Sequence, residues 1–305
     1  MVKFKINDSI WSVLGESFKI YFKNIGKFTQ YMFFPVFGQV IGIVLIFGLT
    51  AWFGVSLPYL INRYSALNNF SVILMLLILI TIPGFIVFLK AFWDFLVAYG
   101  AINSMTDALV TTGKLYDFKA HNEVITKQTY KYIGLLLVIS ILFLIGINPL
   151  FWVIGMIFFV YFVLVFQVFT FEQDLSIFEI FKRSLNLIKG NFARTFVIMT
   201  ILYIISYYLL SIATTALFEV IRFAEILKGV FESWAISLPI NEFNSFLLSY
   251  RLPTITALEI ANFIFSSSIT FIVAGLTLPL RSVTWSIWYK NLSAIKTVSK
   301  KEKVK

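Results

Sequence analysis

The stretch that decides the fold is Ser71–Ala98, SVILMLLILITIPGFIVFLKAFWDFLVA, in which Lys90 is the first charged residue. About 20 apolar residues in a helix, at about 1.5 Å per residue, cross the roughly 30 Å hydrocarbon core of a bilayer. Further apolar runs lie on both sides of this stretch. The sequence therefore predicts an all-α integral membrane protein with six transmembrane helices, over 31–53, 71–98, 132–147, 150–171, 196–218 and 260–280.

The composition agrees with this fold class. Hydrophobic residues make up 59% of the 305 residues and charged residues only 13%, whereas soluble domains have about 45–50% and about 25%. The chain has no cysteine, which excludes disulfides and thiolate metal sites, and its single histidine excludes a multi-histidine metal centre within one chain. We expect that histidine, His121, to be solvated on a polar cytoplasmic segment, and we expect no cofactor.

Lys and Arg residues are distributed unevenly between the two sides of the predicted spans. Twenty lie on the side that holds both termini, whereas the opposite side has four. Because cytoplasmic loops are enriched in Lys and Arg, both termini are predicted to face the cytoplasm, with a basic cytoplasmic tail over 292–305. The net charge of +10 then indicates contact with anionic membrane lipids, and nucleic acid is not an expected partner.

Two segments between the spans have the pattern of amphipathic helices that lie in the membrane interface. In 8–27 and in 175–189, cations recur along one side of the helix, and aromatic or aliphatic residues cover the rest. Ser176 and Glu179 have the spacing of a capping box at the start of the second segment. We expect both segments to be basic elbows on the anionic inner leaflet, with lipid sensing or partner docking as the alternative.

The two elbows resemble each other when the sequence is shifted by 167 residues. A third, weaker candidate covers 117–131, so the chain is expected to repeat an interfacial helix followed by a two-span hairpin. In the hairpin of spans three and four, only Asn148-Pro149 separates the two runs, and a re-entrant pair is the alternative. The aligned residues are Ser9 with Ser176, Ile10 with Ile177, Trp11 with Phe178, Val13 with Ile180, Ser17 with Ser184, Asn24 with Asn191, and Lys27 with Arg194.

The outer loop over 219–259 opens with a stripe in which acidic and basic residues recur every three or four positions. This spacing predicts an amphipathic helix with a self-paired charged stripe, which either lies flat on the outer leaflet or closes the bundle as a lid. The stripe consists of Glu219, Arg222, Glu225, Lys228 and Glu232.

Gly38 and Gly42 in the first span have the small-xxx-small spacing that lets two helices approach closely. Contact inside the bundle is favoured over a dimer interface. Prolines within or beside the spans are expected to kink or start helices, which membrane bundles tolerate; they are Pro35, Pro83, Pro149 and Pro279.

Four polar residues at membrane depth form the candidate site: Lys90, Asp94, Gln39 and Gln167. Lys90 and Asp94 lie four residues apart on one helix face, and a charge at mid-membrane costs at least about 2.5 kcal/mol. The pair is either an anchor at the inner interface or, if it is buried, a relay or substrate contact. Gln39 and Gln167 are expected to bond neighbouring helices, with a polar path as the alternative.

No catalytic motif is found in the sequence. It contains no phosphate-binding glycine loop, histidine metal motif or nucleophile elbow. Acidic residues near the inner interface could form a cluster, although their spacing does not require one. These residues are Asp107, Asp117, Glu172 and Asp174.

Several short motifs between Gly146 and Leu292 resemble a known family. They resemble the six-span membrane domain fused to some bacterial glycerophosphodiester phosphodiesterases, and its stand-alone, uncharacterised relatives. The departure is Ile180-Phe181, where the family has a small residue. The resemblance implies a bacterial inner-membrane protein; no catalytic residue carries over, because hydrolysis belongs to a separate soluble domain. The motifs are Gly146-Ile-Asn-Pro149, Phe171-Glu172, Ser176 with Glu179, Lys182-Arg183-Ser184, Lys189-Gly190-Asn191-Phe192, Arg194, Leu278-Pro279-Leu280 and Trp288-Tyr289-Lys290-Asn291-Leu292.

The sequence is compatible with three functions. The first is a non-enzymatic, lipid-proximal scaffold or regulatory module, with membrane lipids and a protein partner or second copy of the chain as its partners. The second is a transporter or permease for a small or amphiphilic molecule, which convergence of the four candidate residues on a cavity would favour. The third is a lipid-modifying enzyme, which lacks visible catalytic groups.

Overall fold

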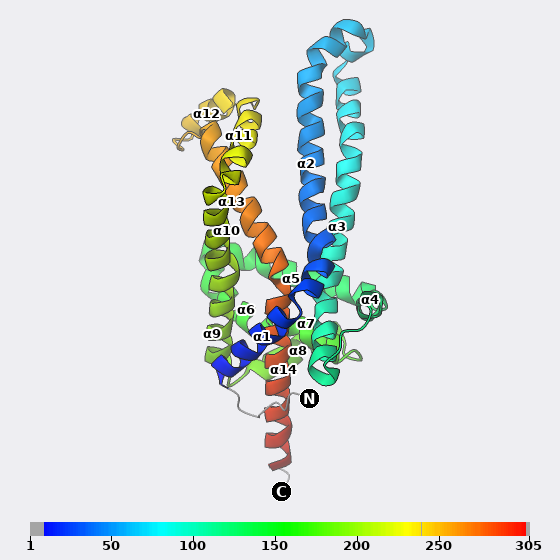
Figure 1. Cartoon of the computed structure of the whole chain (residues 1–305), viewed down its shortest axis with the longest axis vertical. Helices are drawn as coiled ribbons and strands as arrows, with labels where there is room; N and C mark the ends of the chain where they lie inside the picture. The colour runs from blue at the N-terminus through cyan, green and yellow to red at the C-terminus, as the bar shows by residue number, and fades with distance from the viewer. Residues whose placement is uncertain (1–8, 239, 303–305) are drawn as a thin grey trace. The chain divides into compact units, whose positions relative to one another are not determined.

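The computed structural model describes residues 9–238 and 240–302, which form helices joined by short connections and contain no strand (Figure 1). Six helical segments are long and apolar enough to cross a membrane. The chain is therefore an all-α, multi-pass membrane protein, as predicted. The candidate spans are Ile25–Arg63, Phe70–Thr112, Thr129–Gly146, Pro149–Phe171, Phe192–Val220 and Ala257–Leu276.

The helices occur in simple chain order, and the longest belong to the first two spans. They are α1 Ile10–Lys23, α2 Ile25–Arg63, a 3₁₀ turn Ser65–Asn68, α3 Phe70–Thr112, α4 Phe118–Thr126, α5 Thr129–Ile147, a 3₁₀ turn Pro149–Phe151, α6 Trp152–Phe162, α7 Val165–Phe171, α8 Ile177–Ile188, α9 Phe192–Tyr203, a π-helix Ile204–Leu209, α10 Leu210–Val220, α11 Phe223–Ile236, α12 Ile240–Ser249, α13 Ala257–Leu276 and α14 Leu278–Glu302.

Contacts divide the described residues into two compact units. Unit 1 comprises 9–32, 95–204 and 276–302, and unit 2 comprises 33–94 and 205–275. Long helices such as α2 and α3 therefore contribute one end to each unit. The single membrane domain expected over 1–305 stays a prediction.

In unit 1, the two elbow segments form α1 and α8. Ser9 caps α1 by accepting from the Ser12 amide at 3.2 Å. Ser176 and Glu179 form the predicted capping box of α8. The aligned positions also share their burial, with Ser17 and Ser184 buried, and Trp11 and Phe178 73% and 76% exposed. The third candidate, α4, differs because its Asp117 cap makes no side-chain bond. Whether the elbows lie in the membrane interface stays a prediction.

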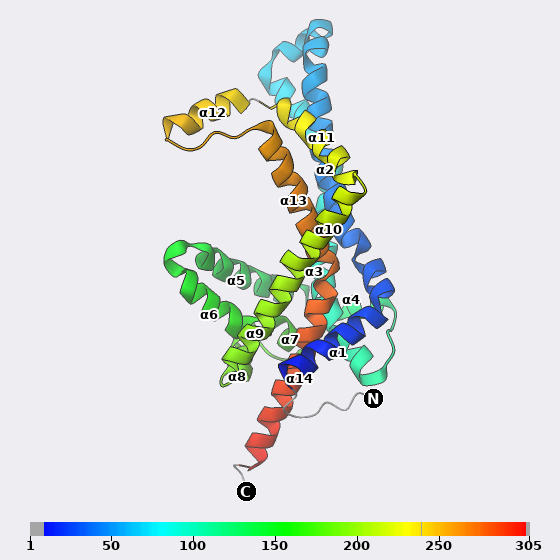
Figure 2. The same cartoon turned by 60° about the vertical axis from the view of Figure 1, so that its left-hand side comes forward.

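The third and fourth predicted spans form a tight helical hairpin, which Figure 2 shows as α5 and α6 side by side. A Cβ on Gly155 would lie 2.5 Å from the Cα of Gly146, so only glycines permit this approach. The rings of Phe143 and Phe159 pack edge-on further along the hairpin, with centroids 5.6 Å apart. The hairpin prediction is confirmed, while its crossing of the bilayer stays a prediction.

In unit 2, α2 and α3 cross with their backbones in close contact. A Cβ on Gly42 would lie 2.6 Å from the backbone nitrogen of Phe88, and one on Gly38 would lie 2.7 Å from the Cβ of Ala91. Gly84 of α3 faces Ile46 of α2 in the same way. The predicted contact of the small residues inside the bundle is confirmed.

The prediction of a continuous charged stripe at the start of the outer segment is wrong. Arg222 has φ +59° and separates α10 from α11, so the helix that would carry the stripe is broken there. The ion pair between Lys228 and Glu219, 3.5 Å long, spans this break. The reason is the apolar face of α11, which folds back to pack Leu227 and Phe231 against a cluster that contains Phe265 of α13.

The chain continues as a helix beyond the sixth span. α13 ends at Leu276, and α14 begins at Leu278 with Pro279 in its first turn, as expected for a proline that starts a helix. Most of the basic tail predicted over 292–305 therefore belongs to α14, which continues to Glu302. Residues 303–305, and residue 8 of the first elbow, lie outside the described residues.

Candidate functional site

The densest polar network of unit 1 surrounds the carboxylate of Glu172, which follows α7. Nε of Arg183 in α8 donates to both carboxylate oxygens, at 2.8 and 3.2 Å. The hydroxyl of Tyr289 in α14 donates to the first of these oxygens at 2.5 Å. One carboxylate thus connects the end of α7 to two further helices.

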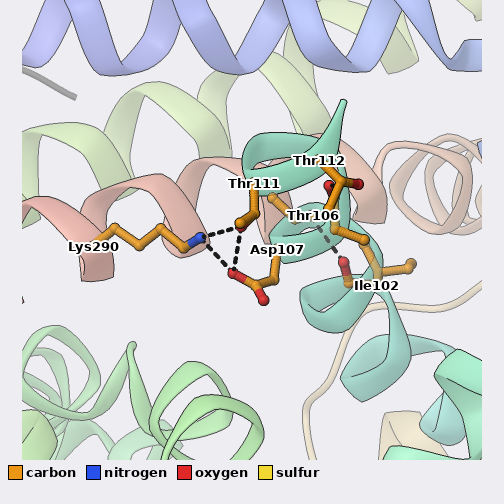
Figure 3. A network of polar contacts seen from close by, with 7 residues as sticks. Ile102, Thr106, Asp107, Thr111, Thr112 and Lys290 are labelled. Atoms are coloured by element: carbon orange, nitrogen blue, oxygen red, sulfur yellow. Dashed lines mark hydrogen bonds and ion pairs between the residues drawn. The ribbon is translucent and has the colours of Figure 1, made fainter. Parts of the chain in front are cut away.

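A second carboxylate, Asp107 of α3, is held by the next residue of α14 (Figure 3). Nζ of Lys290 forms an ion pair with Asp107 and lies 3.4 Å from Oγ1 of Thr111, which donates to the same carboxylate. Lys290 also lies over the ring of Phe171, 6.0 Å from its centroid. We call the group of Asp107, Glu172, Arg183, Tyr289 and Lys290 the carboxylate layer.

The electrostatics of the carboxylate layer favour its ion pairs and hydrogen bonds. Burial, together with the bond to Glu172 and its charge, raises the pKa of Tyr289 to about 12, so the phenol stays a neutral donor. Burial acts to lower the pKa of Arg183, but the bond and charge of Glu172 outweigh it and raise that pKa. At neutral pH Tyr289 and Arg183 therefore stay protonated and donate to Glu172.

Gln167, one of the four candidate residues, pairs with Asn103, which the sequence analysis did not single out. Nε2 of Gln167 donates to Oδ1 of Asn103 at 3.1 Å, and the two side chains are 1% and 0% exposed. We call this pair the amide layer. Asn103 precedes Asp107 by one helical turn on the same face, and this spacing was the available signal.

The other three candidate residues lie in unit 2. Lys90 and Asp94 form an ion pair of 2.5 Å, and the lysine side chain is 60% exposed, with its Nζ 5.8 Å from the ring centroid of Phe34. Gln39 makes no bond to this pair; its Nε2 donates to the carbonyl of Pro35 in its own helix at 2.7 Å. The structure thus brings Lys90 and Asp94 together and gives Gln39 a local role.

The prediction that His121 is solvated is wrong. The imidazole is 4% exposed, and its Nδ1 lies 3.0 Å from the hydroxyl oxygen of Ser104 in α3. Within unit 1, Tyr31 of α2 holds α4, because its hydroxyl donates to Asn122 and its ring packs at a tilt against that of Phe118 with centroids 4.9 Å apart. The sequence pattern around His121 is polar, but one face of this short helix is buried.

The burial of His121 makes the docking of α4 sensitive to pH. Desolvation lowers its pKa below the ordinary 6.5, and the nearby charge of Asp117 only partly opposes this. The undocked state therefore binds a proton more readily, so docking is fully stable above pH of about 6.5 and weakens as the pH falls through that value. We expect amide exchange of α4, corrected for its intrinsic rate, to accelerate between pH 7.5 and 5.5.

His121→Gln provides the control, because glutamine keeps an acceptor and does not titrate. The pH dependence of exchange in α4 should disappear in this variant. If it persisted there unchanged, a group other than His121 would be responsible.

Among the residues that the structure describes, no group of three or more His, Asp or Glu side chains is arranged to hold a metal ion. Two of the four carboxylates considered as an acidic cluster, Asp107 and Glu172, are instead each paired with a cation. The arrangement is thus suited to joining helices.

Comparisons with protein-family models, with curated proteins and with solved structures gave no match.

Proposed function

We propose that this chain is a non-enzymatic, lipid-proximal scaffold of a bacterial cytoplasmic membrane, with both termini in the cytoplasm. The observation that carries the proposal is the apolar surface of its spans. In the most apolar windows of α2 and α3, only 11% of the residues are buried inside the protein. Such faces require lipid chains or the helices of a partner around them.

The two elbows support contact with anionic headgroups. Trp11 and Phe22 of α1 and Phe178 of α8 are exposed aromatic side chains. Exposed lysines accompany them, namely Lys19 and Lys23 in α1 and Lys182 in α8. Aromatic side chains beside cations suit the interface of an anionic leaflet, where each cation contributes about 1 kcal/mol.

A non-enzymatic role is supported by the state of the polar groups in unit 1. The carboxylate of Asp107 is bound by Lys290, and that of Glu172 is bound by Arg183 and Tyr289. Both carboxylates thus bind side chains of the protein itself. A general acid or base instead needs a proton-accepting position open to substrate. The carboxylate layer therefore fits the stabilisation of a scaffold.

Native mass spectrometry tests this proposal on protein released from nanodiscs that contain phosphatidylglycerol and phosphatidylcholine. We expect the protein to retain phosphatidylglycerol preferentially. The variant Lys19→Gln/Lys23→Gln/Lys182→Gln should retain it roughly a hundredfold less, because three cations near the surface contribute about 3 kcal/mol.

The matched control is Lys90→Ala/Asp94→Ala, which removes an ion pair outside the elbows and should leave lipid retention unchanged. A discrete solute that is bound by the unaltered protein and lost in this control would instead support the permease. Equal retention of both lipids by all variants would contradict the proposed lipid contact.

A further inference from the structure

Along α3, the amide layer lies one helical turn from the carboxylate layer, since Asn103 precedes Asp107 by four residues. The start of α7 contacts two successive turns of α3, because Tyr99 packs on Phe166 with ring centroids 4.6 Å apart and Asn103, one turn after Tyr99, bonds Gln167, the residue after Phe166. At the next turn, Lys290 of α14 contacts both Asp107 and Phe171. Three successive turns of α3, at Tyr99, Asn103 and Asp107, are thus each joined to a neighbouring helix by a contact.

α14 brings a third polar side chain to the level of the amide layer. α14 and the end of α3 run in the same direction in Figures 1 and 2. Ser286 precedes Lys290 by one turn and shares its face, so we infer that it lies toward Asn103, which precedes Asp107 by one turn in the same way. Ser286 is fully buried.

Each of these three side chains has a polar atom that no group of the described residues engages. They are Nδ2 of Asn103, Oε1 of Gln167 and Oγ of Ser286. The direct bond between the two amides engages Nε2 of Gln167 and Oδ1 of Asn103, and leaves one nitrogen, Nδ2 of Asn103, and one oxygen, Oε1 of Gln167, without a partner. A buried polar atom without a hydrogen-bond partner is unfavourable. Three such atoms at the same level of α3, α7 and α14 therefore indicate a bound molecule.

The chemistry of the three atoms defines that molecule. It must accept from an amide N–H, donate to an amide oxygen, and donate to or accept from a hydroxyl. It must be uncharged, because the neighbouring charges of Asp107 and Glu172 are already balanced by Lys290 and Arg183. It must also be small enough to fit between packed helices.

We propose that a water molecule binds between α3, α7 and α14. It accepts a hydrogen bond from Nδ2 of Asn103 and donates to Oε1 of Gln167 and to Oγ of Ser286. Three partners are the usual number for a buried water. If the two ends of both amides are exchanged together, the direct bond between them and the two bonds of the water to them reverse direction, and the site is still satisfied.

The sign of a stability change tests the proposal. If the hydroxyl of Ser286 has no partner, Ser286→Ala removes an unsatisfied group and raises Tm. If it binds the water, the same change removes one of three anchors and lowers Tm. We expect a lower Tm, and a raised or unchanged Tm would overturn the proposal. Thr284→Val is the control on the same helix, because the hydroxyl of Thr284 donates to the carbonyl of Leu280 in its own helix, at 2.9 Å.

A direct readout is magnetisation transfer from water to side-chain amides in protein labelled with ¹⁵N-Asn and ¹⁵N-Gln in nanodiscs. We expect a signal from long-lived water at the Asn103 amide, lost in Ser286→Ala, and no such signal at Gln39, whose amide bonds its own helix. No transfer to Asn103 in the unaltered protein would mean a dry site. In an experimental structure of the protein, density larger than one water at this position would assign the site to a small polar solute and would equally overturn the proposal.

Discussion

Gly42→Ala is expected to destabilise the protein by about 2–3 kcal/mol, although it adds a single methyl group. The new Cβ would lie 2.6 Å from the backbone nitrogen and 2.7 Å from the Cα of Phe88. A backbone cannot rotate away as a side chain does, so α2 and α3 must separate and lose contacts along their crossing. Thermal unfolding in detergent, followed by far-ultraviolet circular dichroism, measures the change.

Gly48→Ala is the matched control in the same helix. A Cβ on Gly48 meets nothing within 4 Å. Because alanine is the better helix former by about 1 kcal/mol, this variant should be as stable as the unaltered protein or more stable. Equal effects of the two substitutions would show that the crossing of α2 and α3 does not depend on close backbone contact.

Glu172→Ala is expected to cost about 1–2 kcal/mol and to loosen α8 and α14. It leaves the guanidinium of Arg183 and the hydroxyl of Tyr289 without their common acceptor. The loss is smaller than for a deeply buried pair, because the side chains of Arg183 and Glu172 are 36% and 27% exposed and water partly replaces the carboxylate. Thermal unfolding, with hydrogen exchange of α8, measures both effects.

Asp174→Ala serves as the comparison, two residues further along the chain. Asp174 is exposed, so its removal should change stability by less than about 0.5 kcal/mol. A comparable loss of stability in both variants would contradict the role of Glu172 in joining α7 to α8 and α14. Unchanged hydrogen exchange of α8 in Glu172→Ala would contradict it as well.

The spans could be predicted from the sequence because their signal is local. Each apolar run, such as Ser71–Ala98, is long enough to cross a bilayer on its own, and its helix needs no distant residue. The capping box of Ser176 and Glu179 was equally predictable, because both partners lie within one turn. The glycine spacing of Gly38 and Gly42 also indicated a close helix contact, although not its partner in α3.

The polar layers were less accessible to prediction because their contacts join distant parts of the chain. Lys290 and Asp107 are 183 residues apart, and Gln167 and Asn103 are 64 apart. No spacing rule connects such distant positions, so the pairing of Asn103 with Gln167 was missed, and Gln167 was grouped with Lys90 as a polar residue at membrane depth. His121 was misjudged for a related reason, since its polar partner, Ser104, belongs to another helix.

The consecutive placement of Tyr289 and Lys290 has a mechanical consequence. Neighbouring residues of a helix point about 100° apart, so the two side chains hold α14 from two directions, one bound to Glu172 and the other to Asp107. A single anchor would let the helix swivel, but two at this angle resist rotation about its axis. A torque applied near the carboxyl end of α14, by a partner or by the membrane, would therefore be transmitted through both carboxylates to α3 and α7.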